Sequence, residues 1–491
     1  MSENIKIKSD EIVYAARGQA VVEARQPLES ECRILSVTAS ASTMPSEVFA
    51  GEARYAGKVR FDCIVLIDGR IDCISSVAEF SDKIVSPAIA SGSAVTLMPE
   101  VINVEASADG GTLKAVAVVD TVAVTTKSDE YSCLAEPDDG IYAEKRTVEY
   151  CTVCAEQAES VYVTDSVGAA KITDILCATS RAVVTGAEAA SGEVKVTGTV
   201  YSDAIVRTDD DMVSSVRIVT PFVKSISAFG ANDGNTAFAV ANVTDTAATL
   251  VSEENRIELA VTMTVNVTAV DCRTVEAVTD VFCADYEIQP KTAYAACCTA
   301  SPLVTVTDAV DGQIPIAEDR LAADNVLCVT GVSCTLSNVS VQDKRVIAEG
   351  LVGGDIVYYN AEKNAYDTVA FRLPFSMPLS AHVDAQDVTA TAVVTDVSVR
   401  IRRESVFDIK AEVAFTLRAS SKAECEFVES VGIGAPIPRP DASVIVHIAK
   451  QGETLWQAAK ALCCSPERVL QQNEATAPFA GGERLINFCN K

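Results

Sequence analysis

The chain has 491 residues, a formal net charge of −28 and a pI near 4.5. Its length allows three or four domains, and its acidity repels phosphate backbones, so nucleic acid is not an expected partner. Most of its apolar residues are Val, Ala, Ile and Leu, and only 5% of all residues are aromatic. Because chains rich in Val and poor in aromatic residues favour strands over helices, we expect a mainly β protein.

The N-terminal segment and the cysteines indicate the compartment. Residues 1–19 carry charges at Lys6, Lys8, Asp10 and Glu11, among others, and lack the apolar core of a signal peptide. No apolar run in the sequence reaches the length of a transmembrane segment. The 17 cysteines are scattered instead of forming the framework of a small disulfide-bonded domain. These features predict a cytoplasmic chain with reduced thiols that pack as small apolar groups.

Three stretches of the first 430 residues share one succession of features. Each begins with a β-branched residue followed by Leu, at Leu35, Leu176 and Leu327, with spacings of 141 and 151 residues. A glycine in a strand-like run and then a segment centred on phenylalanine follow each start: Gly57 and Phe80, Gly198 and Phe222, Gly350 and Phe375. Units of this length are whole domains and not turns of a solenoid, so we expect three tandem domains.

Long alternating segments close the second and third of these stretches. Residues 257–268 and 407–418 place an apolar side chain at every second position. Since successive side chains of a strand point to opposite faces, this pattern predicts antiparallel sheets with one face on a core. Several such strands per unit favour a β-sandwich or a partly open barrel, and the pattern leaves both open.

The last 60 residues read as a spacer followed by a small module. Residues 430–442 contain Gly432, Gly434 and three alternating prolines, a composition typical of an extended spacer. After the spacer, a short strand at 444–448 precedes two helices, the first capped by Thr454 and the second started by Ser465-Pro466. A final strand around 485–486 gives the order strand, helix, helix, strand.

The sequence of this module resembles the LysM family. The motifs are Gly452–Ala459 (GETLWQAA), Ser465–Asn473 (SPERVLQQN) and Gly482–Ile486 (GERLI). The resemblance implies binding of N-acetylglucosamine-containing glycans, such as peptidoglycan, in a groove between the first turn and the loop before the last strand. The implied groove residues are Gly452, Glu453, Thr454, Leu455, Thr476, Ala477, Pro478 and Phe479. Glu453 stands where the family usually has Asp, and Gly481 stands where a Pro often precedes the Gly.

Tandem β-domains followed by such a module resemble the SipL-type spore coat morphogenetic proteins, which carry SPOCS domains and a C-terminal LysM. The resemblance rests on the Leu starts, the in-strand glycines and the closing segments Ser128–Cys133 and Val278–Cys283. It implies a lead segment at 1–33, SPOCS-like β-domains at 34–158, 168–312 and 313–429, a Gly/Pro linker at 430–442 and a LysM domain at 443–491.

The same resemblance implies a role in sporulation. Such proteins act in the mother-cell cytoplasm at the forespore surface, where the LysM engages a coat ATPase of the SpoIVA type or another coat protein. The apolar Pro478 and Phe479 beside the groove suit a protein contact. The alternative is a cell-wall protein that binds peptidoglycan or its precursor directly, although such a protein is expected to carry an export signal.

Catalytic and metal chemistry find little support in the sequence. His382 and His447 are the only histidines, which makes a hydrolase triad or a His-rich zinc site hard to assemble. Cys151-Thr152-Val153-Cys154 lacks a second C-x-x-C, so we expect neither metal nor cofactor. Trp456, the single Trp, is interpreted as a core anchor of the module in preference to a sugar-stacking residue. The chain is therefore predicted to be a binding and assembly protein and not an enzyme; a LysM-tethered enzyme is the remaining class.

Overall fold

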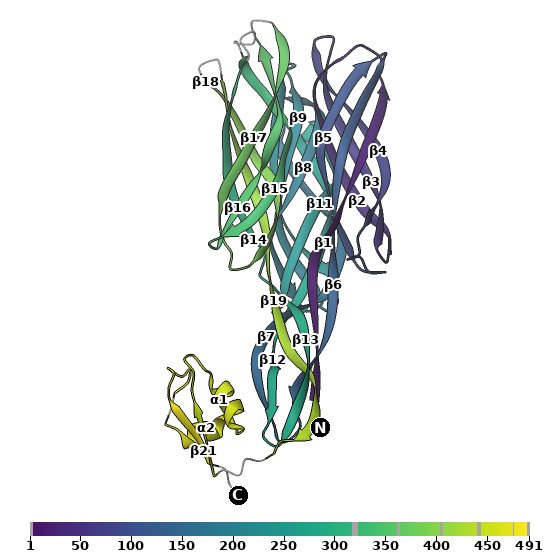
Figure 1. Cartoon of the computed structure of the whole chain (residues 1–491). Helices are drawn as coiled ribbons and strands as arrows, with labels where there is room; N and C mark the ends of the chain where they lie inside the picture. Colours follow the sequence, from purple (N-terminus) through teal and green to yellow (C-terminus); the bar gives the residue numbers. More distant parts are fainter. Residues whose placement is uncertain are drawn as a thin grey trace.

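The computed structural model describes residues 3–316, 323–360, 364–402, 406–438, 443–474 and 476–488. It is mainly β, as predicted, and all strand pairs of the described residues are antiparallel. Long strands form a broad body that narrows into a stalk, and a small module with two helices lies beside the end of the stalk (Figure 1). Within the described ranges, none of the helices is both long and apolar enough to span a bilayer.

Strand pairing divides residues 3–436 into three units of the same strand order. In unit 1 one sheet has the order β2-β3-β4 and the facing sheet the order β1-β6-β5. Their buried apolar side chains meet between the sheets as a sandwich core. The strands are β1 (Glu3–Pro27), β2 (Arg33–Phe49), β3 (Glu52–Ile67), β4 (Arg70–Val85), β5 (Val95–Asp109) and β6 (Thr112–Glu136).

Unit 2 joins its two halves into one six-stranded sheet, because Thr236 pairs with Glu188 across the corner between them. The buried apolar side chains of both halves share one core. The strands are β7 (Ile141–Gly168), β8 (Ile172–Ala190), β9 (Glu193–Thr208), β10 (Val213–Ser227), β11 (Thr236–Val251) and β12 (Arg256–Cys283), with a 3-10 turn, η1 (Ser252–Glu254), before β12.

Unit 3 again has two separate sheets over a common core. The first has the order β15-β16-β17, and in the second β19 pairs with β13, β14 and β18. The strands are β13 (Tyr286–Ala300), β14 (Val304–Pro315), β15 (Ala323–Gln342), β16 (Arg345–Asn360), β17 (Ala365–His382), β18 (Asp387–Arg402) and β19 (Val406–Pro436).

The unit boundaries differ from those expected from the sequence. Residues 3–27, expected in a lead segment, pair with β6 along their whole length. Residues 141–158 and 286–312, assigned to the preceding domains, supply the opening strands of units 2 and 3. The first part of the expected linker is also strand, since β19 stays paired with β13 as far as Pro436. In each unit the opening strand joins a closing strand that lies beyond all the other strands of the unit in sequence, a pairing that local patterns do not reveal.

The recurring Gly and Phe of the sequence lie opposite each other on neighbouring strands. Phe80 pairs with Gly57, Phe222 with Gly198 and Phe375 with Gly350. In each pair the Phe ring covers the glycine: a Cβ would lie 2.4, 2.5 and 2.9 Å from the Cζ of Phe80, Phe222 and Phe375, respectively. β3, β9 and β16 therefore need glycine at these positions, because an aromatic ring occupies the space that a side chain would fill.

The three units share an apolar seam where they meet. Leu35, Leu176 and Leu327 pack there with the buried thiols of Cys177 and Cys328. Burial raises the pKa of Cys328 to about 12, so this thiol is an inert packing group.

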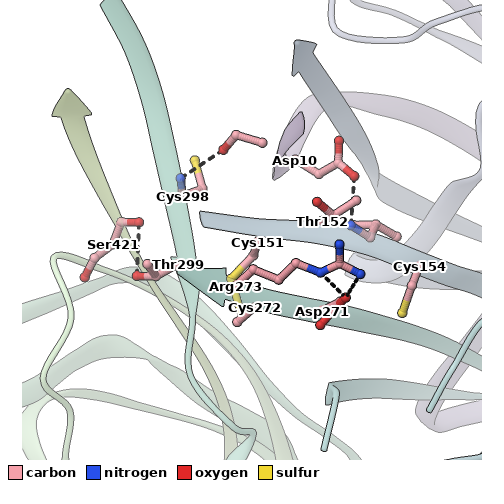
Figure 2. Close-up of a disulfide and its surroundings, with 12 residues drawn as sticks. Asp10, Cys151, Thr152, Cys154, Asp271, Cys272, Arg273, Cys298, Thr299 and Ser421 are labelled. Carbon is pink, nitrogen blue, oxygen red and sulfur yellow. Dashed lines mark hydrogen bonds and ion pairs between the residues drawn. A yellow bond between two sulfur atoms is a disulfide. The ribbon is translucent and has the colours of Figure 1, made fainter. Parts of the chain in front are cut away.

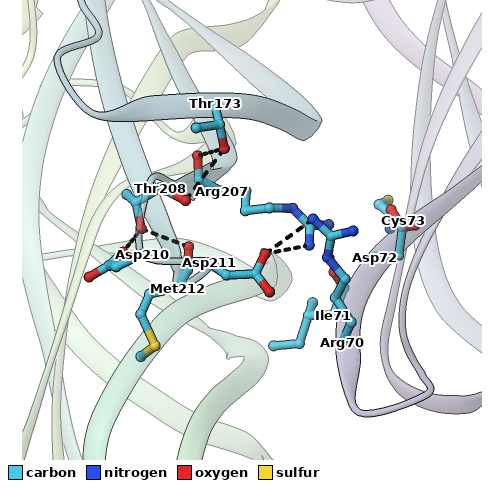
Figure 3. Close-up of polar contacts among 10 residues, drawn as sticks. All are labelled: Arg70, Ile71, Asp72, Cys73, Thr173, Arg207, Thr208, Asp210, Asp211 and Met212. Atoms are coloured by element: carbon cyan, nitrogen blue, oxygen red, sulfur yellow. Dashed lines mark hydrogen bonds and ion pairs between the residues drawn. The ribbon is translucent and has the colours of Figure 1, made fainter.

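Polar contacts fasten units 1 and 2 at one rim of the seam. The guanidinium groups of Arg70 and Arg207 lie 3.1 and 3.2 Å from the same Asp211 oxygen (Figure 3). Arg207, which is buried, also donates to the carbonyl of Ile71 in the hairpin of unit 1 at 2.9 Å. The hydrogen bond from Arg207 and the charge of Arg70 lower the pKa of Asp211, which keeps this link ionised.

The stalk consists of three long two-stranded ribbons, β1/β6, β7/β12 and β13/β19 (Figure 1). Cys133, Ala277 and Phe427, one from each closing strand, meet in its buried interior. A second layer, made by Leu134, Val278 and Val428, is one residue further along each strand. The ribbons are therefore held together by a narrow apolar core that continues from the body.

One cysteine pair differs from the expectation of reduced thiols. Cys151 and Cys272 are directly opposed on β7 and β12 and form a disulfide, with their Cα atoms 4.2 Å apart (Figure 2). The thiol of Cys154, the other member of the C-x-x-C, instead donates to the Ala269 carbonyl at 3.2 Å. Directly opposed strand positions bring the two sulfurs together, although 121 residues separate them in sequence.

We expect alkylation of the unfolded, unreduced chain to leave Cys151 and Cys272 unlabelled, because their sulfurs are in the disulfide. Replacing both Cys151 and Cys272 by Ser should lower the free energy of unfolding by about 2–4 kcal/mol, since the link closes a long loop. Cys154→Ser is the control and should change stability little, because a hydroxyl can keep the hydrogen bond to Ala269. Mass spectrometry that finds 17 labels would contradict the disulfide.

Candidate binding groove of the C-terminal module

The module pairs a two-stranded sheet with two short helices. β20 (Val444–Ile448) and β21 (Arg484–Phe488) are antiparallel, and α1 (Leu455–Leu462) and α2 (Pro466–Gln472) connect them in chain order. Thr454 starts α1 with a reciprocal cap, in which its hydroxyl accepts from the Gln457 N–H and the Gln457 side chain accepts from the Thr454 N–H. Ser465 caps α2 with Pro466 in its first turn.

The two loops expected to form the groove are hydrogen-bonded to each other. The Gly452 N–H donates to the Phe479 carbonyl at 2.8 Å, and the Phe479 N–H donates to the Glu453 carbonyl at 3.0 Å. These bonds bring residues 452–455 and 476–479 side by side. All eight expected groove residues therefore lie in one small region.

The groove residues divide into surface and interior groups. Gly452, Thr454, Thr476 and Pro478 are exposed, and Leu455 and Ala477 are half-buried. Phe479 and Glu453 are buried, Phe479 within the apolar core of the module. A ligand in this groove would therefore contact the first six residues, while Phe479 and Glu453 hold the loops in place.

The carboxylate of Glu453 turns inward and bonds to its own module. It accepts from the Lys450 N–H at 2.6 Å and lies 2.8 Å from His447 Nε2. The backbone N–H of Lys450, followed by His447, lowers the pKa of Glu453 despite its burial. His447 thus acts here as a partner of Glu453, and the pair fixes the turn before α1.

We expect Glu453→Gln to destabilise the module by about 1–2 kcal/mol at neutral pH, because a neutral amide replaces a charge-assisted acceptor. The folded-state pKa of Glu453 is lowered, so its contribution to stability is present above the ordinary carboxyl pKa and is lost as pH falls through the lowered value. Unfolding curves followed by Trp456 emission should therefore differ near pH 7 and converge in acid. Glu474→Gln, at an exposed carboxylate of the same module, is the control. A difference between wild type and Glu453→Gln that is independent of pH would contradict the assigned role.

Gly481 is required by the close approach of two loops. Its φ is +101°, and a Cβ there would lie 2.9 Å from the Gln451 backbone nitrogen. Glu483 accepts from the N–H groups of Ala480 and Gly481 at 2.8 and 2.7 Å, which fixes the turn. A side chain at position 481 would therefore disturb the contact between these two loops.

Trp456 joins the module to the stalk, a role that the interpretation as a core anchor did not include. It is 8% exposed and packs with Ala459 and Leu462, but its ring also contacts Phe282 of β12 at a centroid distance of 4.9 Å. Its indole N–H donates to Asp280 at 2.8 Å, and Lys460 donates to the same carboxylate. No local pattern in the sequence indicated that Asp280 and Phe282 contact the module.

Charge also supports this junction. Burial acts to raise the pKa of Asp280, but hydrogen bonds from Lys460 and Trp456 outweigh it and lower the pKa. The carboxylate therefore stays ionised at neutral pH and binds two groups of α1. Together with the stacking of Tyr142 on Phe282, at a centroid distance of 5.0 Å, these contacts attach one face of α1 to the end of the stalk.

A cavity of about 480 Å³, which was not expected from the sequence, lies between the three units of the body. Asp62, Asp203 and Asp355, which occupy matching positions on β3, β9 and β16, line it. Asp203 bonds to Arg181 and Arg217, Asp62 to Arg60 and Ser75, and Asp355 to Ser36. Of these bonds, the one from Ser36 to Asp355 joins units 1 and 3, and the others lie within a single unit.

Within the described ranges, no three or more His, Cys, Asp or Glu side chains are grouped in a way that could hold a metal ion. No protein-family model matches the chain, and no curated protein matches it. Among solved structures, the LG1-3 region of the laminin alpha2 chain aligns with 88% of this chain and 100% of its own length, at 7% identity and a TM-score of 0.06. A likeness of that size carries no argument about fold or function.

Proposed function

We propose that this chain is a non-enzymatic scaffold of spore coat assembly whose C-terminal LysM-like module docks to a coat protein at the forespore surface, in the mother-cell cytoplasm. The observation that carries the proposal is the architecture: three units of one strand order continue into a stalk, and a small module packs against the stalk at its end. A long body with a binding module at one end suits a scaffold that holds a coat protein at a distance from the rest of the chain. The expected partner is a coat ATPase of the SpoIVA type or another coat protein.

The shared Gly–Phe pairing of the units supports a common SPOCS-like origin. Each pair lies on the second and third strands of the first sheet of its unit. The order of strands and helices in residues 444–488, together with the three sequence motifs, supports the LysM-like assignment. Both assignments are parts of the proposal.

The composition of the groove favours a protein ligand. Its one carboxylate, Glu453, is turned inward, so the groove presents Leu455, Ala477 and Pro478 between the exposed hydroxyls of Thr454 and Thr476. Apolar side chains with hydroxyls at the rim match the composition of a small protein–protein contact. The same two hydroxyls favour the alternative, a glycan of N-acetylglucosamine units in peptidoglycan.

The test compares two ligands on the full chain. The wild type should capture a coat protein from lysates of sporulating cells and should show no heat of binding with chitin oligomers in titration calorimetry. Leu455→Asp should abolish capture, whereas Leu470→Asp, at an exposed leucine of α2, should retain it. Tight binding to chitin oligomers that Leu455→Asp abolishes would favour the glycan-binding alternative.

A further inference from the structure

The outer face of the β20–β21 ribbon is apolar and exposed. Val446 and Ile448 of β20 are 56% and 62% exposed, and Phe488 of β21 is 49% exposed. Val444 pairs with Phe488 and Val446 with Ile486, and directly paired residues of antiparallel strands share one face. Five apolar side chains therefore gather on this ribbon face, with Arg484 opposite Ile448 at its end.

The other surfaces of the module are already occupied. The opposite ribbon face carries Leu485, which is buried in the module core with residues of both helices. One face of α1 is attached to the stalk through Trp456 and Lys460. The ribbon is on the side of the module away from the stalk (Figure 1). Its outer face is therefore available to another molecule while the module remains docked.

The charge distribution indicates which molecule this is. Residues 441–491 contain five acidic and five basic side chains, so residues 1–440 carry the whole net charge of −28. Two bodies of that charge repel each other, whereas two modules do not. Two copies can thus meet through the apolar ribbon face of the module while their acidic bodies stay apart.

We propose that the ribbon face, defined by Val444, Val446, Ile448, Ile486 and Phe488, is a self-association surface that binds the same face of a second copy of this chain. A two-fold axis through the face places apolar side chains against apolar side chains and requires no matching of polar groups. Stacked ribbons of this kind pack face to face as in a β-sandwich. Five side chains bury less than the roughly 800 Å² per partner of a standard interface, so the dimer is weak and depends on concentration.

The inference is independent of the groove and of the proposed coat partner. It is tested by sedimentation equilibrium of the full chain from roughly 1 to 200 µM. The mean mass should rise from 51.8 kDa toward twice that value for the wild type. The variant Val446→Glu/Ile448→Glu should stay at the monomer mass, because it places like charges across the two-fold axis. The matched control is Val219→Glu/Val223→Glu on β10, at positions 49% and 57% exposed, and it should behave as the wild type.

Unchanged Trp456 emission verifies that the module remains folded in each variant. If the Glu variant unfolds, Val446→Thr/Ile448→Thr replaces it; this variant keeps β-branched side chains and should weaken the dimer several-fold. A wild type that stays at the monomer mass at every concentration would overturn the inference. So would a dimer that survives the ribbon substitutions in a folded module, or one that is lost in the β10 control alone.

Discussion

Replacing Trp456 by Ala is expected to destabilise the C-terminal module by about 3–5 kcal/mol, because it removes a buried aromatic from a small core. That is most of the stability that a domain of about 50 residues has, so the module should unfold while the β-body stays folded. Backbone NMR should show loss of dispersion for the module signals only. The same substitution removes the contact with Phe282 and the hydrogen bond to Asp280, so the remaining module should also leave the stalk.

Phe282→Ala separates docking from folding. It removes the stalk side of the contact and leaves Trp456 within its own core, so the module should stay folded and detach. The emission of Trp456, the chain's one Trp, should then shift to longer wavelength as one side of its ring becomes hydrated. Tyr286→Ala, at an exposed aromatic near the same end of the stalk, is the control and should leave the emission unchanged. An unshifted emission in Phe282→Ala would show that Trp456 belongs to the module core alone.

The second large effect is expected at the glycines that lie beneath the phenylalanines. In Gly198→Ala the new methyl group would lie 2.4 Å from the Val183 carbonyl oxygen and 2.5 Å from Phe222 Cζ. Rotation of the ring cannot relieve the contact with the backbone oxygen, so strands must shift, at a cost of about 2–4 kcal/mol. Urea unfolding followed by circular dichroism measures the change.

Two further variants make this test specific. Gly168→Ala is the control, because nothing lies within 4 Å of a Cβ at that position, and its effect should be within about 0.5 kcal/mol. At Gly57 the nearest atoms belong to the Phe80 ring, so Phe80→Leu should partly restore the stability of Gly57→Ala. Equal stabilities for Gly198→Ala and Gly168→Ala would contradict the steric account.

The sequence predicted features that depend on near neighbours. The alternation of residues 257–268 identified a strand with one buried face. The recurrence of Gly and Phe marked equivalent strands of the three units, although their pairing was not predicted. Thr454 and Ser465 identified the starts of both helices of the module, because capping is set within three or four residues. The eight groove residues lie together because two short loops of one small module carry them.

Features that depend on distant partners were missed. Glu3 pairs with Glu136, and no signal in residues 1–33 indicates that they complete a sheet closed more than 100 residues later. Cys151 and Cys272 face each other only because β7 and β12 pair in that register. Asp280 and Phe282 appeared to be ordinary closing-strand residues, and their contact with Trp456 follows from the placement of a separate module.

The proposed role in coat assembly depends on the C-terminal module, and its location in living cells is the most direct test. Fluorescent fusions of the full chain, of residues 1–440 and of Leu455→Asp should be imaged in sporulating cells. We predict that the full chain surrounds the forespore and that both altered chains disperse through the mother-cell cytosol. A chain of residues 1–440 that still surrounds the forespore would contradict the account, because docking would then not require the module.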